Sequence, residues 1–319
     1  GMILCTDDCH SGTLVHDGHM NRVLRHAIAC GADPVVALQM CTINTATHFG
    51  LERELGAIAP GRRADMILTS DLRDLPVETV WARGVKVAEA GDILVDCPHI
   101  AWPDAARASV HLGRDLMAED FAVTAPDGAN AVTAKVIGVV ENQAPTKALT
   151  AELPVVDGVV EGEGGVCQIA LVERHRGTGG VVNGFVSGFG YQGRVAVAST
   201  VAHDSHHMIV VGTDRASMAA AAMRLQEVGG GVTVFKDGTE IALVELPIAG
   251  LMSDRPAAEV AAKAQGMVEA MASCGCTLNN AYMQHSLLAL VVIPELRISD
   301  MGLIDVTRFE KTDLFEGAQ

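Results

Sequence analysis

Two adjacent aspartates near the start of the chain have the residue types for metal or acid–base chemistry. Asp7 and Asp8 follow the apolar run of residues 2–6, which we expect to form a short buried strand. Catalytic residues of β/α barrels collect at the carboxyl ends of the strands. Because neighbouring side chains on a strand alternate in direction, one carboxylate can hold a metal or take a proton from water while the other hydrogen-bonds a substrate nitrogen. The alternative is a helix N-cap beside a solvated acid.

A histidine-rich segment is the second candidate for chemistry. Residues 203–207 read His-Asp-Ser-His-His and lie between two expected strands. Three histidines and an aspartate at this density suit metal binding, proton shuttling or purine recognition. The alternative is a surface loop whose histidines bond backbone groups. Glu173 and His175 follow another expected strand of the same region and can share that site.

The elements that position the first candidate resemble the tail of an α/β unit. Apolar residues recur at helical spacing over residues 20–29. Asp33 and Pro34 are typical of an N-cap and a first helical position, so they predict that a second helix begins there. A further short helix is expected over residues 45–49.

A small β unit is expected next. Residues 56–68 read as strand, turn and strand, with Pro60-Gly61 at the turn. A hairpin is expected over residues 77–88, turning at Arg83-Gly84.

The remaining chain predicts a mixed α+β domain, because strand and helix patterns alternate in it. A helix is expected from an N-cap at Thr213 or Asp214 to Val228, and another from an N-cap at Ser253 to about Ser273. A hairpin is expected to turn at Asp237-Gly238. Strands are expected over residues 132–140, 155–160, 166–173, 195–201, 208–211, 232–235 and 239–246.

Composition narrows the class of protein. A chain of 319 residues is long enough for two or more structural units. Its net charge of −16 repels phosphate backbones and argues against a nucleic-acid partner. No apolar run reaches the roughly 18 residues of a membrane helix, and residues 287–294 are expected to form a short buried strand instead. The eight cysteines suit reduced thiols in the cytosol.

Several motifs resemble the bacterial adenine deaminases of the amidohydrolase superfamily. Residues 4–8, followed by Gly18-His19-Met20, are similar to the end of the eighth barrel strand of that family. Residues 44–65 are similar to the general amidohydrolase exit from the barrel into a β-sandwich. The motifs that resemble the extra C-terminal domain of the family are Glu173-Arg174-His175, Gly177-Thr178-Gly179, Gly184-Phe185-Val186, Gly188-Phe189-Gly190 and the segments 202–206 and 248–254.

The resemblance implies a fold of three parts. Residues 1–50 would be a remnant of the metal-dependent β/α barrel, containing its last strand and helices. Residues 51–97 would be a small β-sandwich segment. Residues 98–319 would be the α+β C-terminal domain of the adenine deaminase type.

The resemblance also implies an activity, namely hydrolysis of the 6-amino group of adenine to give hypoxanthine and ammonia in purine salvage. A binuclear centre of divalent manganese or iron would activate the water. The enzyme would be cytoplasmic and homo-oligomeric, with a small-molecule substrate and neither a nucleic-acid nor a membrane partner.

Residue roles follow from the same resemblance. Asp7 matches the last metal-binding carboxylate, which also accepts a proton from the water, and Asp8 would contact a ring nitrogen. The C-terminal domain would close the site with the catalytic candidates His203, Asp204 and His206 and the substrate-binding candidates Glu173 and His175.

The other metal ligands of the family are a His-x-His pair, a bridging Glu and two further His, all from earlier barrel strands. We therefore expect the 319 residues to be inactive by themselves. Two alternatives remain open: an amidohydrolase acting on another aminopurine or a cyclic amide, and a non-catalytic oligomerisation or regulatory module.

Overall fold

The computed structural model describes residues 1–98 and 100–317. Its internal contacts divide the chain into two units, Gly1–Ala101 and Trp102–Gln319. In the described residues, no helix combines the length and the apolarity that a membrane span needs.

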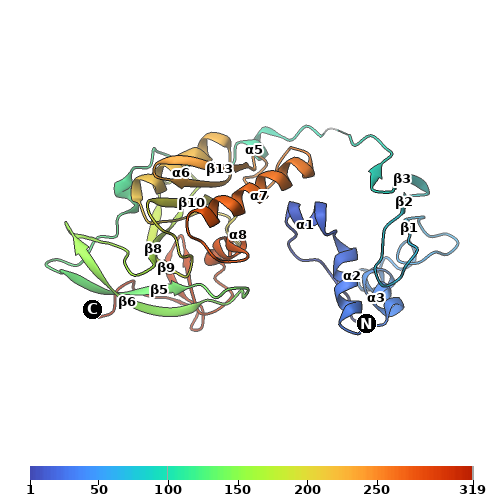
Figure 1. Ribbon diagram of the computed structural model, residues 1–319, viewed down its shortest axis with the longest axis horizontal. Helices are drawn as coiled ribbons and strands as arrows, with labels where there is room; N and C mark the ends of the chain where they lie inside the picture. Colours follow the sequence, from blue (N-terminus) through green and yellow to red (C-terminus); the bar gives the residue numbers. More distant parts are fainter. Residues whose placement is uncertain (99, 318–319) are drawn as a thin grey trace. The chain divides into compact units, whose positions relative to one another are not determined.

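Four short helices open the first unit (Figure 1): α1 (Ser11–His16), α2 (Met20–Ala29), α3 (Pro34–Cys41) and α4 (Ile43–His48). The predicted start of α3 is confirmed, because the Asp33 carboxylate accepts hydrogen bonds from the amides of Val35 and Val36 with Pro34 in the first turn. The buried core of this unit is small and consists of Leu24, Ile28, Ala37 and Leu75.

Residues 2–6 do not form the expected strand. Leu4 donates a backbone hydrogen bond to the carbonyl of Met40, but no ladder forms and Met2 and Ile3 are exposed. A strand needs a neighbour to pair with, and no strand within 1–98 and 100–317 pairs with this segment. Asp7 and Asp8 therefore follow a segment that is not part of a sheet.

The β unit forms a four-stranded antiparallel sheet in the order β1 (Met66–Leu68), β2 (Thr79–Ala82), β3 (Val85–Glu89) and β4 (Asp92–Ile93). The predicted hairpin is confirmed, with φ of +50° at Arg83 and +79° at Gly84, the signs that a type I′ turn requires. Residues 56–59 were wrongly expected as a strand. Gly56 packs against α4, where a Cβ added to it would lie 2.8 Å from the Cα of Ile43, and residues 57–59 are exposed.

A nine-stranded sheet forms the centre of the second unit, in the order β13-β12-β10-β11-β8-β9-β5-β6-β7. All neighbours are antiparallel except β5 and β9. The strands are β5 (Ala131–Gly138), β6 (Lys147–Val156), β7 (Val159–Val160), β8 (Val166–Val172), β9 (Val181–Ser187), β10 (Val195–Ser199), β11 (Met208–Gly212), β12 (Gly231–Lys236) and β13 (Thr239–Glu245).

Both faces of the central strands are buried. Along β8, Ile169 and Leu171 face one core, while Ala170 and Val172 face the other, as the period of two residues in a strand requires. The first core includes residues of α7 (Ala257–Ser273), α8 (Ala281–Ser286) and β14 (Leu296–Ser299). The second core includes residues of α6 (Arg215–Val228). The predicted mixed α+β class is therefore confirmed.

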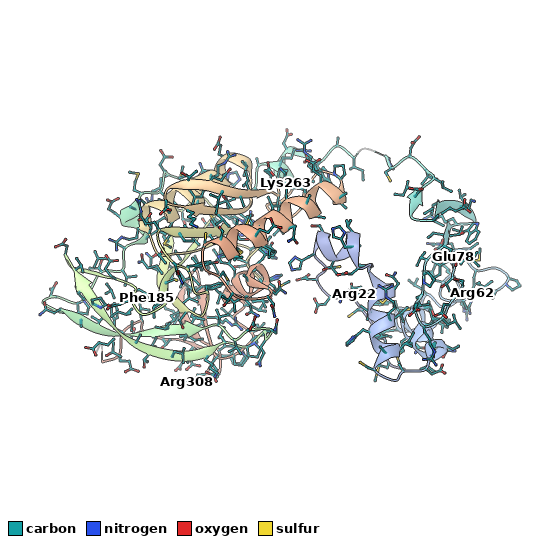
Figure 2. The ribbon with its side chains drawn as sticks, viewed as in Figure 1. Arg22, Arg62, Glu78, Phe185, Lys263 and Arg308 are labelled. Atoms are coloured by element: carbon teal, nitrogen blue, oxygen red, sulfur yellow. The ribbon has the colours of Figure 1, made fainter. Side chains whose placement is uncertain are left out.

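Buried side chains and an ion pair connect the elements of the second unit (Figure 2). Phe185 of β9 is fully buried, and Lys263 of α7 forms an ion pair with Glu245 of β13 at 2.5 Å. The predicted cap of α6 is confirmed, because the Asp214 carboxylate accepts from the amide of Ser217. Ser253 does not cap α7, whose N-cap is Pro256; the Ser253 hydroxyl instead accepts from the amide of Arg255.

Further differences from the expected strands remain, and they include β9 and most of β6, which were not expected as strands. Residues 155–160 form the end of β6, a turn and β7, because Asp157 and Gly158 both have positive φ. Residues 287–294 contain the 3-10 turn η2 (Leu287–Ala289) where a strand was expected. A separate three-stranded sheet, β14, β15 (Gly302–Asp305) and β16 (Glu310–Lys311), was not expected.

Candidate functional site

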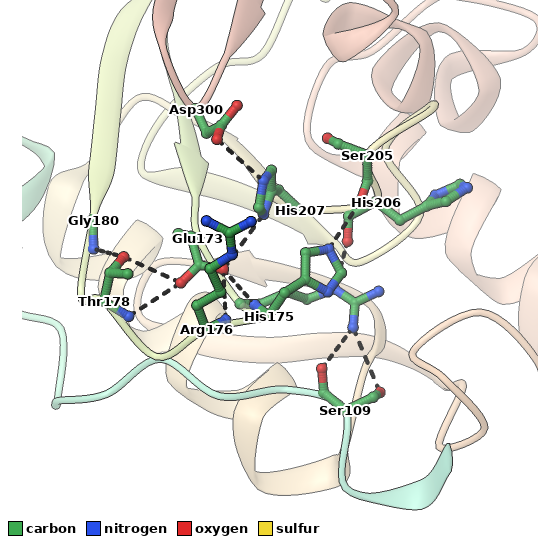
Figure 3. Close-up of polar contacts among 11 residues, drawn as sticks. Ser109, Glu173, His175, Arg176, Thr178, Gly180, Ser205, His206, His207 and Asp300 are labelled. Atoms are coloured by element: carbon green, nitrogen blue, oxygen red, sulfur yellow. Dashed lines mark hydrogen bonds and ion pairs between the residues drawn. The ribbon is translucent and has the colours of Figure 1, made fainter. Parts of the chain in front are cut away.

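A pocket of about 460 Å³ lies in the second unit, where the ends of β8 and β9 meet the loop that joins β10 to β11 (Figure 3). Its floor is apolar and its walls are polar. It is lined by Leu171, Glu173, His175, Arg176, Thr178, Gly180, Val181, Val182, Ser205, His207 and Asp300.

Glu173 holds the loop that follows β8. Its carboxylate accepts from the backbone amides of His175, Arg176 and Thr178 at 2.5 to 3.1 Å, and from the Thr178 hydroxyl at 3.1 Å. Burial alone would raise the pKa of Glu173, but these hydrogen bonds outweigh it and lower the pKa to about 2. Glu173 is therefore an ionised carboxylate that fixes the loop backbone.

Replacing Glu173 by Gln is expected to remove a pH-dependent part of the stability. The pKa of Glu173 lies below the 4.5 of an ordinary glutamate, so its carboxylate stabilises the fold above about pH 4.5 and loses this effect as pH falls toward 2. Urea unfolding at pH 7 should show Glu173→Gln less stable by on the order of 2 kcal/mol. The difference should shrink at pH 3. An equal difference at both pH values would contradict this role.

Arg174 joins three segments of the sequence. It is 1% exposed. Its guanidinium donates to the carbonyls of His206 at 2.5 Å, Ser109 at 2.8 Å and Ala249 at 3.1 Å. Burial lowers the pKa of Arg174 to about 10, so the side chain remains charged at neutral pH. The cation therefore connects the loop at 173–178, the histidine-rich loop and the 248–254 segment.

The histidine-rich loop has a defined backbone. The Nδ1 atom of His206 accepts a hydrogen bond from the amide of Ala202 at 3.2 Å, and His206 has φ of +50°. The amide of His203 donates to the carbonyl of Ser286. The rings of His203 and His206 are 5.3 Å apart, and Asp204 is exposed. Because Nδ1 of His206 is an acceptor, the proton of its neutral ring is on Nε2.

His207 lies deeper in the pocket, with 9% of its side chain exposed. Its Nδ1 atom is 4.0 Å from the Glu173 carboxylate and has no hydrogen-bond partner among the described residues, while its Nε2 atom is 3.7 Å from the carboxylate of Asp300. Its ring lies 4.8 Å from the ring of His175, whose Nε2 contacts the carbonyl of Ser205 at 2.8 Å. Burial first, and then His175, lower the pKa of His207, so the ring is neutral at pH 7.

Asp7 and Asp8 belong to the first unit, and both are exposed. The amide of Asp8 donates to the Asp7 carboxylate at 2.7 Å, and Asp7 has φ of +54°. The hydroxyl of Thr6 lies 3.4 Å from Nε2 of His19.

The described residues do not fit a metal ion by themselves. Across 1–98 and 100–317, no three or more His, Cys, Asp or Glu side chains are grouped so that they could hold one. Protein metal sites commonly use three or more protein ligands. Asp7 would therefore be only one of the ligands that such an ion needs.

The structure brings together the two sequence candidates of the second unit. Glu173 and His175 lie beside the loop that carries His203, Asp204 and His206, as the shared contacts of Arg174 and Ser205 show. Sequence reasoning counted His207 in the histidine-rich segment without giving it a role of its own, and it did not single out Asp300 or Ser109. The histidine run is a sequence signal that could have indicated His207. No sequence signal indicates Asp300, because only the β14–β15 turn places it at the pocket.

Comparison with known proteins first shows the class of protein to which the two units are similar. A model of the amidohydrolase family matches residues 2–87, so the first unit contains an amidohydrolase segment. A model of the adenine deaminase C-terminal domain matches residues 143–310, which is more than half of the chain and includes every polar residue named in the pocket. The chain belongs to the adenine deaminase family.

Curated relatives support the same family. An adenine deaminase of Ruegeria pomeroyi is 78% identical over 317 residues, which is 98% of this chain and 53% of the relative. An adenine deaminase of Paracoccus denitrificans is 77% identical, and one of Moorella thermoacetica is 45% identical over 99% of this chain. The chain spans about half the length of these curated relatives.

Proposed function

We propose that this chain forms the C-terminal half of a hydrolase that converts adenine and water to hypoxanthine and ammonia. The observation that carries the proposal is the pocket in the region matching the adenine deaminase C-terminal domain, where Arg174 connects three motif segments. The similarity to relatives named adenine deaminase supports the choice of adenine.

The proposed roles divide between the units. Asp7 binds a metal and accepts a proton from the attacking water, and Asp8 hydrogen-bonds a ring nitrogen of the base. From the second unit, His203, Asp204 and His206 act as catalytic groups that close the site. His175 and Glu173 contact the substrate, and the Glu173 carboxylate also accepts hydrogen bonds from its own loop.

The biological setting is also part of the proposal. The metal is divalent manganese or iron, with its other ligands supplied from outside these 319 residues. The reaction serves purine salvage in the cytoplasm, and the enzyme is a homo-oligomer. The structural divisions proposed within the chain are a barrel remnant over 1–50, a β-sandwich segment over 51–97 and the C-terminal domain over 98–319.

Substrate profiling tests the proposed reaction. The chain is produced as a fusion with the N-terminal half of the Ruegeria pomeroyi relative, loaded with Mn²⁺, and supplied with adenine, other aminopurines and cyclic amides. We expect ammonia release with the highest kcat/KM for adenine. A fusion that hydrolyses a cyclic amide and leaves adenine unchanged would contradict the proposal.

A further inference from the structure

We propose that the pocket of the second unit is a binding site for a flat aminopurine base, recognised by His207 and Asp300 (Figure 3). The sequence motifs include His207 only as one of three histidines in a run, and neither the motifs nor the comparisons give Asp300 a role. The choice of an aminopurine rests on the proposed function, whereas the existence of the pocket does not.

The size and floor of the pocket suit a flat ring. Ligand pockets for small molecules commonly span roughly 300 to 1,000 Å³ and are mostly apolar with a few polar groups, and this pocket has about 460 Å³. Leu171, Val181 and Val182 supply the apolar surface. A base that covers these side chains gains from their removal from water.

His207 and Asp300 form a widely spaced polar pair in the lining of the pocket. Their facing atoms are 3.7 Å apart, which is too long for a hydrogen bond, and half of the Asp300 side chain is exposed. Adenine presents an amino donor beside a ring-nitrogen acceptor. The carboxylate of Asp300 can accept from the amino group while the neutral ring of His207 donates to the ring nitrogen.

The other charges around the pocket disfavour an anion or a metal ion. The carboxylate of Glu173 accepts four hydrogen bonds from its own loop, and the guanidinium of Arg174 is engaged by three carbonyls. The guanidinium of Arg176 also lines the pocket and carries one positive charge beside the carboxylates of Glu173 and Asp300. A phosphate would therefore meet two carboxylates, one guanidinium and a neutral imidazole, and the described residues contain no metal-binding group of three.

Calorimetric titration of adenine into the whole 319-residue chain, with EDTA present, tests this site without any catalysis. We expect saturable binding at a 1:1 ratio. Asp300→Ala should weaken binding about tenfold, the effect of losing one hydrogen bond to a charged group. Asp313→Ala is the matched control, an exposed aspartate outside the pocket, and should leave binding unchanged.

Three results would overturn the inference: no saturable binding at millimolar adenine, equal affinity of Asp300→Ala and the unaltered chain, or binding of inorganic phosphate that adenine does not displace. The fusion enzyme separates this inference from the proposed function. Deamination by Asp300→Ala with an unchanged KM would support the proposed function and contradict the binding of the base by this pocket. Adenine binding that depends on Asp300, together with an inactive fusion that carries its metal, would support the binding site and contradict the proposed function.

Discussion

Replacement of Asp7 by Asn in the fusion enzyme is expected to lower kcat for adenine about a thousandfold, within the range that a positioned proton-accepting group contributes. Asn keeps the size of the side chain but cannot accept the proton of the attacking water or provide a charged metal ligand. Asn also tolerates the φ of +54° at this position, so the backbone should not change. Steady-state kinetics of adenine consumption at saturating Mn²⁺ measure the effect.

The matched control is Asp17→Asn, which alters an exposed aspartate of the same unit and should retain full kcat. Metal content measured beside the rate distinguishes lost binding from lost proton transfer. An Asp7→Asn enzyme with the kcat of the unaltered fusion would refute the proposed role of Asp7.

Replacement of Arg174 by Met is expected to destabilise the second unit by about 3 kcal/mol or more. The change leaves three carbonyl acceptors, those of Ser109, His206 and Ala249, without their donor in a buried place. Each buried group that loses its partner costs on the order of 1 to 3 kcal/mol. The urea midpoint of the 319-residue chain, followed by far-ultraviolet circular dichroism, measures the loss.

Arg176→Met is the control, because this neighbouring arginine is exposed and should change stability by less than about 0.5 kcal/mol. Arg174→Lys should fall between the two, since an ammonium retains the charge but cannot reach three separate carbonyls with a planar fork. A midpoint for Arg174→Met equal to that of the control would show that the three segments do not depend on this cation.

Local signals in the sequence were enough to predict many elements of the fold. Asp33 with Pro34, Asp214 with Gly229, and the turn at Arg83-Gly84 each determine the ends of an element through nearby residues. Segments that depend on distant partners were predicted less well. The apolar run at 2–6 has the composition of a strand, but no strand of the described residues pairs with it, and Gly56 packs on a helix instead of joining a sheet.

The candidate site shows the same division. The charged and histidine-rich motifs pointed to residues 173–175 and 203–206, and the structure places these together through Arg174. Asp300 reaches the pocket from a hairpin more than ninety positions after the histidine loop, so no local pattern indicates it. Glu173 stays a predicted substrate contact, and the structure adds the hydrogen bonds from its own loop, which a sequence does not reveal.

The central claim is that this chain supplies the C-terminal half of an adenine deaminase, and one measurement tests it most directly. The 319-residue chain and the N-terminal half of the Ruegeria pomeroyi relative are purified separately, mixed with Mn²⁺, and assayed for hypoxanthine formed from adenine. We predict hypoxanthine from the mixture or the fusion and none from either half alone. A fusion that is folded and loaded with metal but forms no hypoxanthine would contradict the claim.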